Sequence, residues 1–201
     1  MVWRSGLVCL FVVFALKSAF AQTSGSYSVE IDLQEQTAYL VRDGRVVLST
    51  PIASGRYGHL TEPGSFKIID KERSHFSTLY GKIVNASGRT IVSDADADMP
   101  VPRGGRFIPA PMRYFMRFNE SIGMHAGYLP GYPASHGCVR LPEENAIAFF
   151  NAVNVGTPVT VFGRTPRGRS TEEARLRTQG YRPQFVDPRF DQRLVAPWWW
   201  R

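Results

Sequence analysis

Short alternating runs of apolar and polar residues dominate the chain between positions 27 and 163. In YSVEIDL, residues Val29, Ile31 and Leu33 share one face, because successive side chains of a strand point to opposite sides. TAYLVR and RVVLST flank Asp43-Gly44, a dipeptide that accepts the positive φ angles of a type I′ turn and so predicts a hairpin. Further strands are predicted in GSFKIID, GRTIVSD, RYFMRF, SIGMHA and TPVTVFG. This pattern indicates a mainly β domain, a sandwich or a barrel.

One interior segment has the spacing of an amphipathic helix, from Pro142 to Val153. Proline suits the first turn of a helix, and Glu143 and Glu144 complement the helix dipole there. The apolar stripe of this helix consists of Ala146, Phe149, Phe150 and Val153. By contrast, the run MPVPRGGRFIPAPM at positions 99–112 contains too much proline and glycine for regular structure. It predicts a loop that serves as a lid or a substrate wall.

The first 21 residues have the pattern of a signal peptide. Arg4 supplies the positive charge, an apolar run covers positions 6–16, and Ala19-Phe20-Ala21 fits a cleavage site. An uncleaved anchor is the alternative, but Lys17 interrupts the apolar run before it reaches the ~20 residues that a spanning helix needs. We therefore expect an exported protein of the periplasm or cell envelope, with residues 22–26 as a linker to the domain at 27–163.

Export changes the meaning of the two cysteines. Cys9 leaves with the signal peptide, so Cys138 has no partner for an internal disulfide. A lone thiol in an oxidising compartment is a liability unless it is used or buried as a small apolar residue. The neighbours of Cys138, a histidine and a glycine, favour use over burial.

The stretch IGMHAGYLPGYPASHGCVRLP combines this thiol with His125 and His136. Its glycines and prolines favour turns, across which an imidazole and a thiol can meet. A base that removes the proton and a sulfur that attacks are the minimum for nucleophilic catalysis. An adjacent imidazole would lower the thiol pKa below its free value of ~8.5. We interpret the stretch as an active site.

Two stretches contain residues that could bind a metal. Asp94, Asp96 and Asp98 have the spacing that begins a calcium loop, but that loop also requires glycine and glutamate at later positions, which Met99 and Gly105 occupy. A solvated acidic turn is the better interpretation. Zinc could bind the two histidines and the thiol of the central stretch, with His59 or His75 as a fourth ligand, but no paired ligand motif supports it. No metal or cofactor is predicted.

The central stretch also resembles the signature of the L,D-transpeptidase (YkuD-type) catalytic domain, a histidine followed by Ser-His-Gly-Cys and then Arg or Asn. Upstream, IDLQEQTAYLVRDGRVVLSTPIASG resembles the opening strands of that domain, and TEPGSFKI and RYFMRFNESIGMHAG resemble later segments. The similarity covers roughly residues 27–163. It implies an L,D-transpeptidase-type β-sandwich with one interior helix, acting on the stem peptide of peptidoglycan.

The resemblance also implies roles for individual residues. Cys138 would be the nucleophile and His125 its general base, held through its other ring nitrogen by the carbonyl of Ala126. Backbone N–H groups around His136, Gly137 and Cys138 would form the oxyanion hole, with Ser135 orienting the turn. The expected substrate contacts are Arg140, which would pair with a carboxylate, and, as walls of the groove, Tyr128, Tyr132 and Tyr114.

The implied reaction is acyl transfer from diaminopimelate of a tetrapeptide stem, with release of D-alanine. The acceptor stays open: a second diaminopimelate would give a 3→3 cross-link, a lipoprotein lysine a covalent tether, and water a carboxypeptidase. The alternative of another class is a non-catalytic envelope-binding module that keeps a vestigial thiol. Such a module would be expected to lack one of the signature residues, and all are present here.

The charge of the chain is concentrated outside the predicted domain. Residues 22–163 contain thirteen basic and thirteen acidic side chains, whereas residues 164–201 contain nine arginines and four acidic residues. The neutral domain gives no electrostatic support for nucleic-acid binding. The tail at 164–201 begins with a capping box at 170–173, which predicts a short arginine-rich helix, and it carries Trp198, Trp199 and Trp200. We expect this tail to contact an anionic envelope surface.

Overall fold

The computed structural model describes residues 25–166 and the backbone of residues 184–185. Within these residues the protein is mainly β, with two sheets that form a sandwich and one α-helix, as the sequence predicts. The strands, in chain order, are β1 Tyr27–Asp32, β2 Thr37–Arg42, β3 Arg45–Pro51, β4 Gly64–Lys67, β5 Asp70–Val84, β6 Thr90–Asp96, β7 Arg106–Asn119, β8 Ile122–Ala126, β9 Val139–Leu141, β10 Pro158–Phe162 and β11 Gln184–Phe185.

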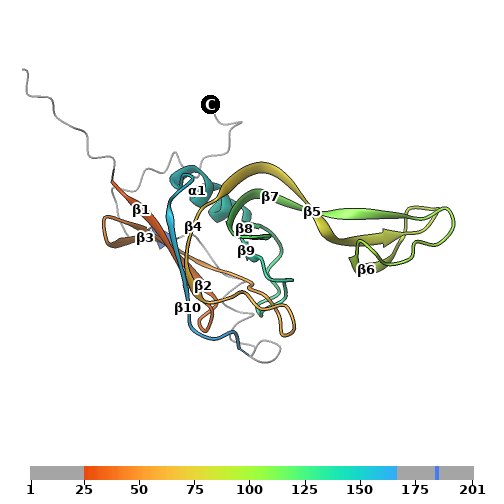
Figure 1. Cartoon of the computed structure of the whole chain (residues 1–201), viewed down its shortest axis with the longest axis horizontal. Coiled ribbons are helices and arrows are strands. Elements are labelled where there is room, and N and C mark those ends of the chain that lie inside the picture. Colours follow the sequence, from red (N-terminus) through yellow and green to blue (C-terminus); the bar gives the residue numbers. More distant parts are fainter. Residues whose placement is uncertain (1–24, 167–183, 186–201) are drawn as a thin grey trace, which may run out of the picture.

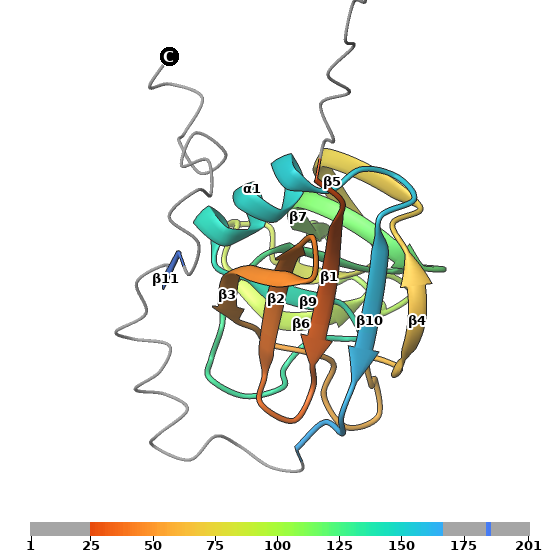
Figure 2. The ribbon, with the colours of Figure 1, turned by 90° about the vertical axis from the view of Figure 1, so that its left-hand side faces the viewer.

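The first sheet has the strand order β11-β3-β2-β1-β10-β4, and Figure 2 looks onto it. β1 and β10 run parallel, and the other neighbours are antiparallel. The predicted turn at Asp43-Gly44 joins β2 to β3, and both residues have positive φ angles, 50° and 74°. This agrees with the type I′ geometry, whose twist matches that of the flanking strands.

The second sheet has the order β6-β5-β7-β8-β9. β8 and β9 are parallel neighbours, which requires a crossover, and the chain between them is the loop of residues 127–138. Helix α1, Glu143–Ala152, follows β9 directly and packs against β7 and β8. Pro142 occupies its N-cap position and Val153 its C-cap, so the predicted helix is confirmed.

The apolar core lies between the two sheets. The alternation that starts in β1 buries Val29, Ile31 and, just after the strand, Leu33, each at most 1% exposed. From the second sheet and the helix come large side chains that are almost fully buried, among them Met116, Phe118, Met124, Leu141 and Phe149. Because this core extends under β8 and β9, it holds the strands that carry the predicted active-site stretch.

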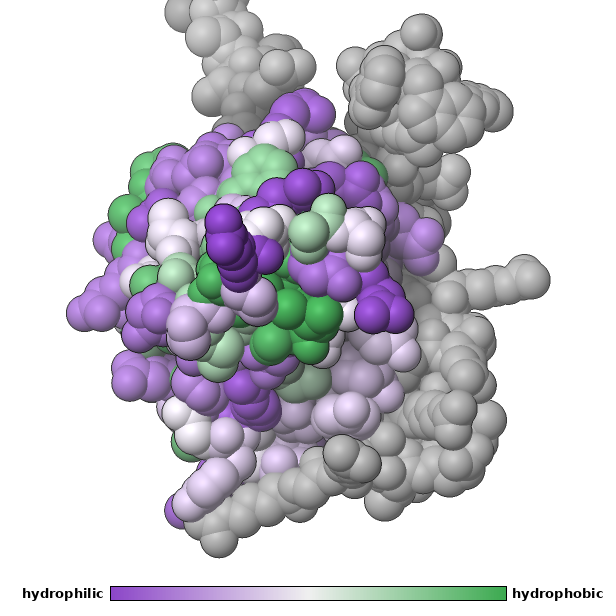
Figure 3. Space-filling model, turned by 90° about the vertical axis from the view of Figure 1, so that its right-hand side faces the viewer, coloured by the Kyte–Doolittle hydropathy of each residue, from purple (hydrophilic) through white to green (hydrophobic). Residues whose placement is uncertain are grey.

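The outer halves of β5 and β7, with β6 and the connecting loops, project from the sandwich (Figure 1). We call this projection, residues 76–110, the arm. The inner halves of β5 and β7 pair within the sandwich, and the pairing shifts between Phe76 and Gly81, where the arm begins. Viewed from the end to which the arm extends, the surface shows apolar residues among hydrophilic ones (Figure 3). The arm exposes Phe76, Leu79, Ile91, Met99 and Val101.

The arm corrects one prediction. Residues 106–112 of the proline-rich run belong to β7, where we predicted a loop throughout. Its prolines are tolerated because β7 pairs there with a β5 strand that is itself irregular: Pro109 lies opposite Gly81 and Pro111 opposite Phe76, on the two sides of the register shift. The length of β5 was also missed, since only its first residue falls in a predicted strand.

The predicted signal peptide at 1–21, the capping-box helix and the tryptophans of the tail lie outside the described residues. In the part of the chain that the structure describes, no helix is long and apolar enough to cross a membrane.

Candidate active site

The active-site stretch is built on the two parallel strands β8 and β9. Their register places His125 opposite Arg140 and Met124 opposite Val139. Cys138 immediately precedes β9, so the strand pairing brings the thiol and the imidazole onto neighbouring strands, two residues apart in register. A separation of thirteen residues in sequence is closed in this way by one crossover loop.

That loop is fastened to the segment after β3. Backbone hydrogen bonds join Ala53 to Arg140 in both directions at 3.0 Å, and the Arg56 N–H donates to the Ser135 carbonyl at 2.9 Å. The Thr61 hydroxyl donates to the Gly137 carbonyl at 2.7 Å and accepts from the Gly55 N–H at 2.9 Å. The turn that presents the thiol is therefore held by the fold on both sides.

His125 is 6% exposed, and its Nδ1 lies 2.9 Å from the Ala126 carbonyl oxygen. Since a carbonyl only accepts, Nδ1 carries the hydrogen and Nε2 is left as the acceptor. Burial is the main cause that lowers the pKa of His125 to about 4, against the opposing effect of the Ala126 hydrogen bond. The imidazole is therefore neutral at physiological pH, the form that a general base requires.

The Cys138 thiol donates a long hydrogen bond, 3.9 Å, to the carbonyl of Ser121 in the turn between β7 and β8. Burial raises the pKa of this thiol, and a hydrogen bond from the Gly123 backbone together with Arg140 only partly offsets the effect. The expectation of a lowered thiol pKa was therefore wrong. No hydrogen bond joins the thiol to His125 among residues 25–166, and the desolvation cost of a buried thiolate dominates.

Gly137 adopts φ +113°, a conformation that side chains rarely accept. A Cβ atom there would also lie 3.2 Å from the Cδ1 atom of Ile122. The Gly137 N–H donates to the Ser135 hydroxyl at 3.1 Å, and that hydroxyl in turn donates to the Cys138 carbonyl. Ser135 thus organises the turn, and the Gly137 N–H is engaged with it.

His136 lies in a separate cluster from His125. Its ring stacks on Tyr80 of β5 at 3.8 Å between centroids, and its Nε2 lies 2.7 Å from Arg56 and 3.5 Å from Asp94. Arg56 also pairs with Asp94 at 3.2 Å. Burial and the nearby Arg56 lower the pKa of His136, against the opposing effect of Asp94. The cluster connects the arm to the turn that carries the thiol.

Asp94 corrects part of the interpretation of the acidic run as a solvated turn: its side chain is 61% exposed, but it belongs to a strand. It lies in β6, and its carboxylate contacts Arg56 and His136. Among the described residues, no group of three or more His, Cys, Asp or Glu side chains could hold a metal ion.

A cavity of about 500 Å³ opens at the thiol. Its walls come from the sandwich, including His125, Cys138 and Arg140, and from the arm, including Leu79 and Tyr80. The described lining contains no Asp or Glu, whereas its basic side chains are His75, Arg117, His125, His136 and Arg140. Arg140 forms no ion pair with any described residue. The unpaired Arg140 guanidinium therefore suits an anionic ligand.

Of the three tyrosines predicted as walls of the groove, one lines the cavity and two do not. Tyr128 is 79% exposed and lines the cavity. Tyr114 has φ 56° and packs edge-on against Phe150 of α1, so the structure places it in the sandwich and not at the cavity. Tyr132 does not line the cavity either.

Several cavity residues were missed by sequence reasoning. His75 and Tyr80 belong to β5, and Arg117 to β7. Their sequence neighbourhoods have no motif, and only the pairing of two long strands brings them to the cavity. The loop at 99–112, expected as a substrate wall, does contribute Ala110, Pro111 and Met112 from its β7 part.

A comparison of the sequence with protein families identifies residues 26–161 as a match to YkuD, the L,D-transpeptidase catalytic domain. The chain belongs to this family. It is 29% identical over 138 residues to L,D-transpeptidase 1 of Mycobacterium tuberculosis (strain ATCC 25618 / H37Rv), a match that covers 65% of this chain and 48% of that protein.

Solved structures agree with the family. An L,D-transpeptidase from Stackebrandtia nassauensis superimposes with a TM-score of 0.52 at 25% identity, covering 75% of this chain and 63% of that one. L,D-transpeptidase 3 from M. tuberculosis, solved with a faropenem-derived adduct, gives a TM-score of 0.52 at 23% identity, covering 69% and 61%, and supports the fold alone. The chain spans about half the length of the curated relative it matches.

Proposed function

We propose that the protein is a peptidoglycan L,D-transpeptidase with Cys138 as its nucleophile. The observation that carries this proposal is the meeting of the thiol, the neutral His125 imidazole and the Arg140 guanidinium in one basic cavity. Family membership supplies the reaction class, acyl transfer on peptidoglycan stem peptides. The stem peptide bears carboxylates, for which a cavity lined by basic side chains is suited.

In the first half-reaction, Cys138 Sγ attacks the carbonyl at the L-centre of diaminopimelate. The thiol proton passes to His125 Nε2 as the C–S bond forms, because both groups are neutral beforehand. The same proton then moves to the departing amine of D-alanine, and a thioester remains. The acceptor amine attacks this thioester in the second half-reaction.

The oxyanion of each tetrahedral intermediate would be stabilised by backbone N–H groups of the turn. Because the Gly137 N–H already donates to Ser135, we assign this role to the N–H groups of His136 and Cys138. Arg140 would pair with a substrate carboxylate, and Tyr128 would form the outer wall of the groove.

The decisive experiment incubates the purified protein with disaccharide-tetrapeptide and analyses the products by mass spectrometry. A cross-linked dimer that has lost one D-alanine supports transpeptidation. Tripeptide alone would instead identify a carboxypeptidase, and an unchanged substrate would favour the binding module or a lipoprotein acceptor. The matched control is Cys138→Ser, which keeps the shape of the side chain but replaces the sulfur.

A second test uses a carbapenem such as imipenem. A thiol nucleophile in this cavity is expected to open the β-lactam ring and form a covalent adduct on Cys138. Membership of the L,D-transpeptidase family motivates this expectation. Intact-mass analysis of the protein and of Cys138→Ser measures it, and an adduct on the serine variant would place the reactive group elsewhere.

We also propose that residues 1–21 direct export to the periplasm or cell envelope and that residues 164–201 contact an anionic surface there. The net charge of the chain beyond residue 21 lies in that tail, and tryptophan suits the headgroup region of a membrane. Co-sedimentation with anionic vesicles at low and high salt, with and without the tail, tests it. Binding that needs the tail and weakens with salt is expected.

A further inference from the structure

A second imidazole lines the cavity, and the reaction scheme leaves it without a role. His75, on β5, stacks on Phe115 at 4.3 Å between ring centroids and 11° between planes, while Phe115 lies 6.4 Å from the His125 ring. The side chain of His75 is 18% exposed. A histidine that merely filled the core would not open onto the same cavity as the thiol.

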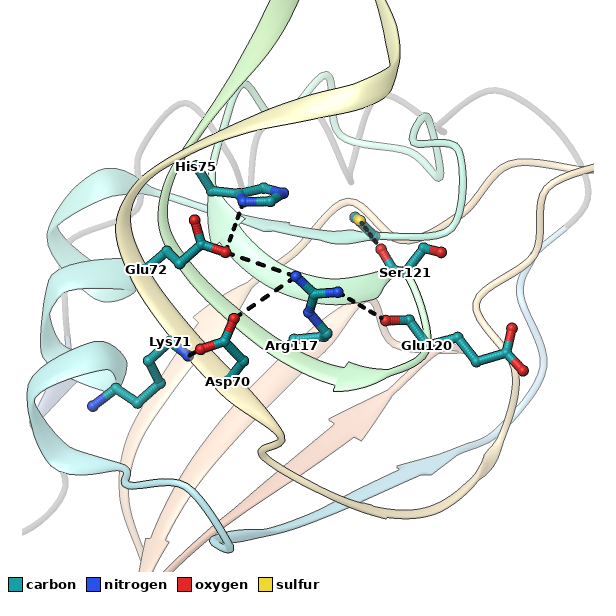
Figure 4. Close-up of polar contacts among 8 residues, drawn as sticks. Asp70, Lys71, Glu72, His75, Arg117, Glu120 and Ser121 are labelled. Carbon is teal, nitrogen blue, oxygen red and sulfur yellow. Dashed lines mark hydrogen bonds and ion pairs between the residues drawn. The ribbon is translucent and has the colours of Figure 1, made fainter.

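His75 is held by a chain of charged groups. Its Nδ1 lies 3.0 Å from Glu72 Oε1, and the same oxygen lies 3.7 Å from the Arg117 guanidinium. Arg117 is held in turn by Asp70 at 3.7 Å and by the Glu120 carbonyl at 3.4 Å. Figure 4 shows this chain running beneath the ring and ending at the turn whose Ser121 carbonyl receives the thiol.

This arrangement orients His75 in the same way as His125. In both rings Nδ1 faces an oxygen acceptor, a carboxylate for His75 and a carbonyl for His125. Nε2 therefore carries the lone pair in the neutral ring, and within residues 25–166 it has no hydrogen-bond partner in either case. In Figure 4 the unbonded nitrogen of His75 points away from Glu72, toward the side on which Ser121 lies.

The second half-reaction again needs a base, this time for the acceptor amine. An alkyl amine has a pKa near ~10, so the acceptor arrives protonated and must lose protons before and during attack. His125, buried and with a pKa of about 4, is a weak proton acceptor, and it must also serve the departing thiolate. His75 is less buried than His125, and the Glu72 carboxylate 3.0 Å from its Nδ1 holds the ring with Nε2 free to accept a proton.

We propose that His75, oriented by Glu72, is the general base for the acceptor amine in the second half-reaction. This inference rests on the proposed function, because it concerns the fate of the acyl-enzyme formed on Cys138. The amine nitrogen forms a C–N bond to the thioester carbon as the C–S bond breaks. The acceptor ammonium first loses one proton to solvent. The second proton leaves the nitrogen as the C–N bond forms, moves to His75 Nε2 and then to solvent, while the thiolate is reprotonated from solvent through His125.

The proposal predicts that the two half-reactions can be separated. In His75→Gln, acylation of Cys138 by imipenem and release of D-alanine from the tetrapeptide are expected to stay within about threefold of wild type. Transfer of the acyl group to meso-diaminopimelic acid should fall about 100-fold, within the range of general-base catalysis. A larger share of the acyl-enzyme is then hydrolysed. The ratio of the product acylated on diaminopimelic acid to free tripeptide therefore falls by a similar factor.

A second variant, Glu72→Gln, tests the orienting carboxylate and should lower the same ratio by a smaller factor. Its matched control is Glu144→Gln, an exposed carboxylate on α1 that does not line the cavity and should leave the ratio unchanged. The thermal midpoint of each variant is measured as a check that the fold is intact. Either His75→Gln or Glu72→Gln can therefore carry the test if the other fails to fold.

Comparing two acceptors distinguishes a general-base role of His75 from a role in which it only shapes the cavity. Hydroxylamine is unprotonated at neutral pH, so its attack needs less help, and the loss in His75→Gln should be at least tenfold smaller for it than for diaminopimelic acid. An equal loss for both nucleophiles would mean that His75 only shapes the site, and would overturn the proposal. An unchanged product ratio with normal acylation would overturn it too. If wild type is not acylated at all, the proposed function is wrong and this inference falls with it.

Discussion

The sandwich and the arm differ in how their strands treat apolar side chains: the sandwich buries them and the arm leaves them exposed. In the sandwich, two sheets bury their apolar faces against each other and against α1, so that Phe118 and Phe149 are at most 2% exposed. In the arm, strands of the second sheet continue without a facing layer, and Phe76 and Leu79 remain 57% and 51% exposed. The same strands β5 and β7 thus pass from a packed to an unpacked environment along their length.

The cavity lies where the two regions meet. The sandwich supplies the groups with proposed chemical roles, Cys138, His125 and Arg140, while the arm supplies wall residues such as Leu79 and Tyr80. Reacting groups need fixed positions, which a close-packed core provides. A wall that only contacts the ligand does not need that rigidity. The comparison predicts that substitutions in the sandwich and in the arm differ in both size and kind.

The largest effect is expected at the sandwich side of the cavity. Cys138→Ser should lower the rate of transpeptidation by about 10⁴-fold or more, because the less nucleophilic hydroxyl has no strong base beside it. The measurement is product formation from disaccharide-tetrapeptide, with the thermal midpoint as a control. Retained turnover in this variant would remove the nucleophile assignment.

A matched pair of phenylalanines compares the stability of the two regions. Phe118→Ala leaves a cavity in the core and should cost about 3–5 kcal/mol in the free energy of unfolding. Phe76→Ala, at an exposed position of the arm, should cost less than about 0.5 kcal/mol. Urea unfolding of both variants gives the two values. Similar costs for the two variants would mean that Phe76 is buried against another surface and that the arm is not exposed.

The pH dependence of stability tests the burial of His125. Its pKa is about 4 in the folded protein against ~6.5 unfolded, so the unfolded chain binds more protons between these values. Stability is therefore lost as the pH falls, by about 2 kcal/mol between pH 7 and pH 5 from this group. Urea unfolding of wild type and His125→Gln at the two pH values measures it. An equal loss in both proteins would contradict the assignment.

The pKa of the Cys138 thiol is expected to lie above that of a free thiol, and a titration can test this. Because burial raises the pKa of Cys138, alkylation of the folded protein should have a midpoint above the free value of ~8.5. Iodoacetamide labelling followed by intact mass across pH gives the midpoint. A value clearly below 8.5 would show that a thiolate–imidazolium pair forms, and the mechanism would then start from a charged pair.

The smallest effect is expected at the contact between the arm and the thiol-bearing turn. Asp94→Asn removes the ion pairs to Arg56 and His136, but at an exposed carboxylate such pairs are worth about 0.2–1 kcal/mol. We expect kcat/KM to fall by no more than about fivefold, with a smaller difference at high salt. The matched control is Asp98→Asn, an exposed carboxylate of the same acidic run. A loss above a hundredfold would make this contact part of the catalytic machinery.

The sequence by itself determined the elements that depend on local chemistry. Alternation in YSVEIDL, the Asp43-Gly44 turn and the apolar stripe after Pro142 each report a period or a backbone preference that is written in a few residues. The candidate nucleophile and base were also recognisable, because a lone thiol near two histidines has little other use and a known signature surrounds it.

Tertiary structure alone decided the rest, because it depends on residues far apart in the chain. Prolines in 106–112 argue locally against a strand, and their pairing with β5 outweighs that preference. His75 and Arg117 reach the cavity only through this pairing, and Asp94 reaches His136 only because β6 continues the same sheet. The direction of the thiol pKa was likewise undecidable from sequence, since an adjacent imidazole lowers it and desolvation raises it. Burial, which only the fold sets, determines which of the two prevails.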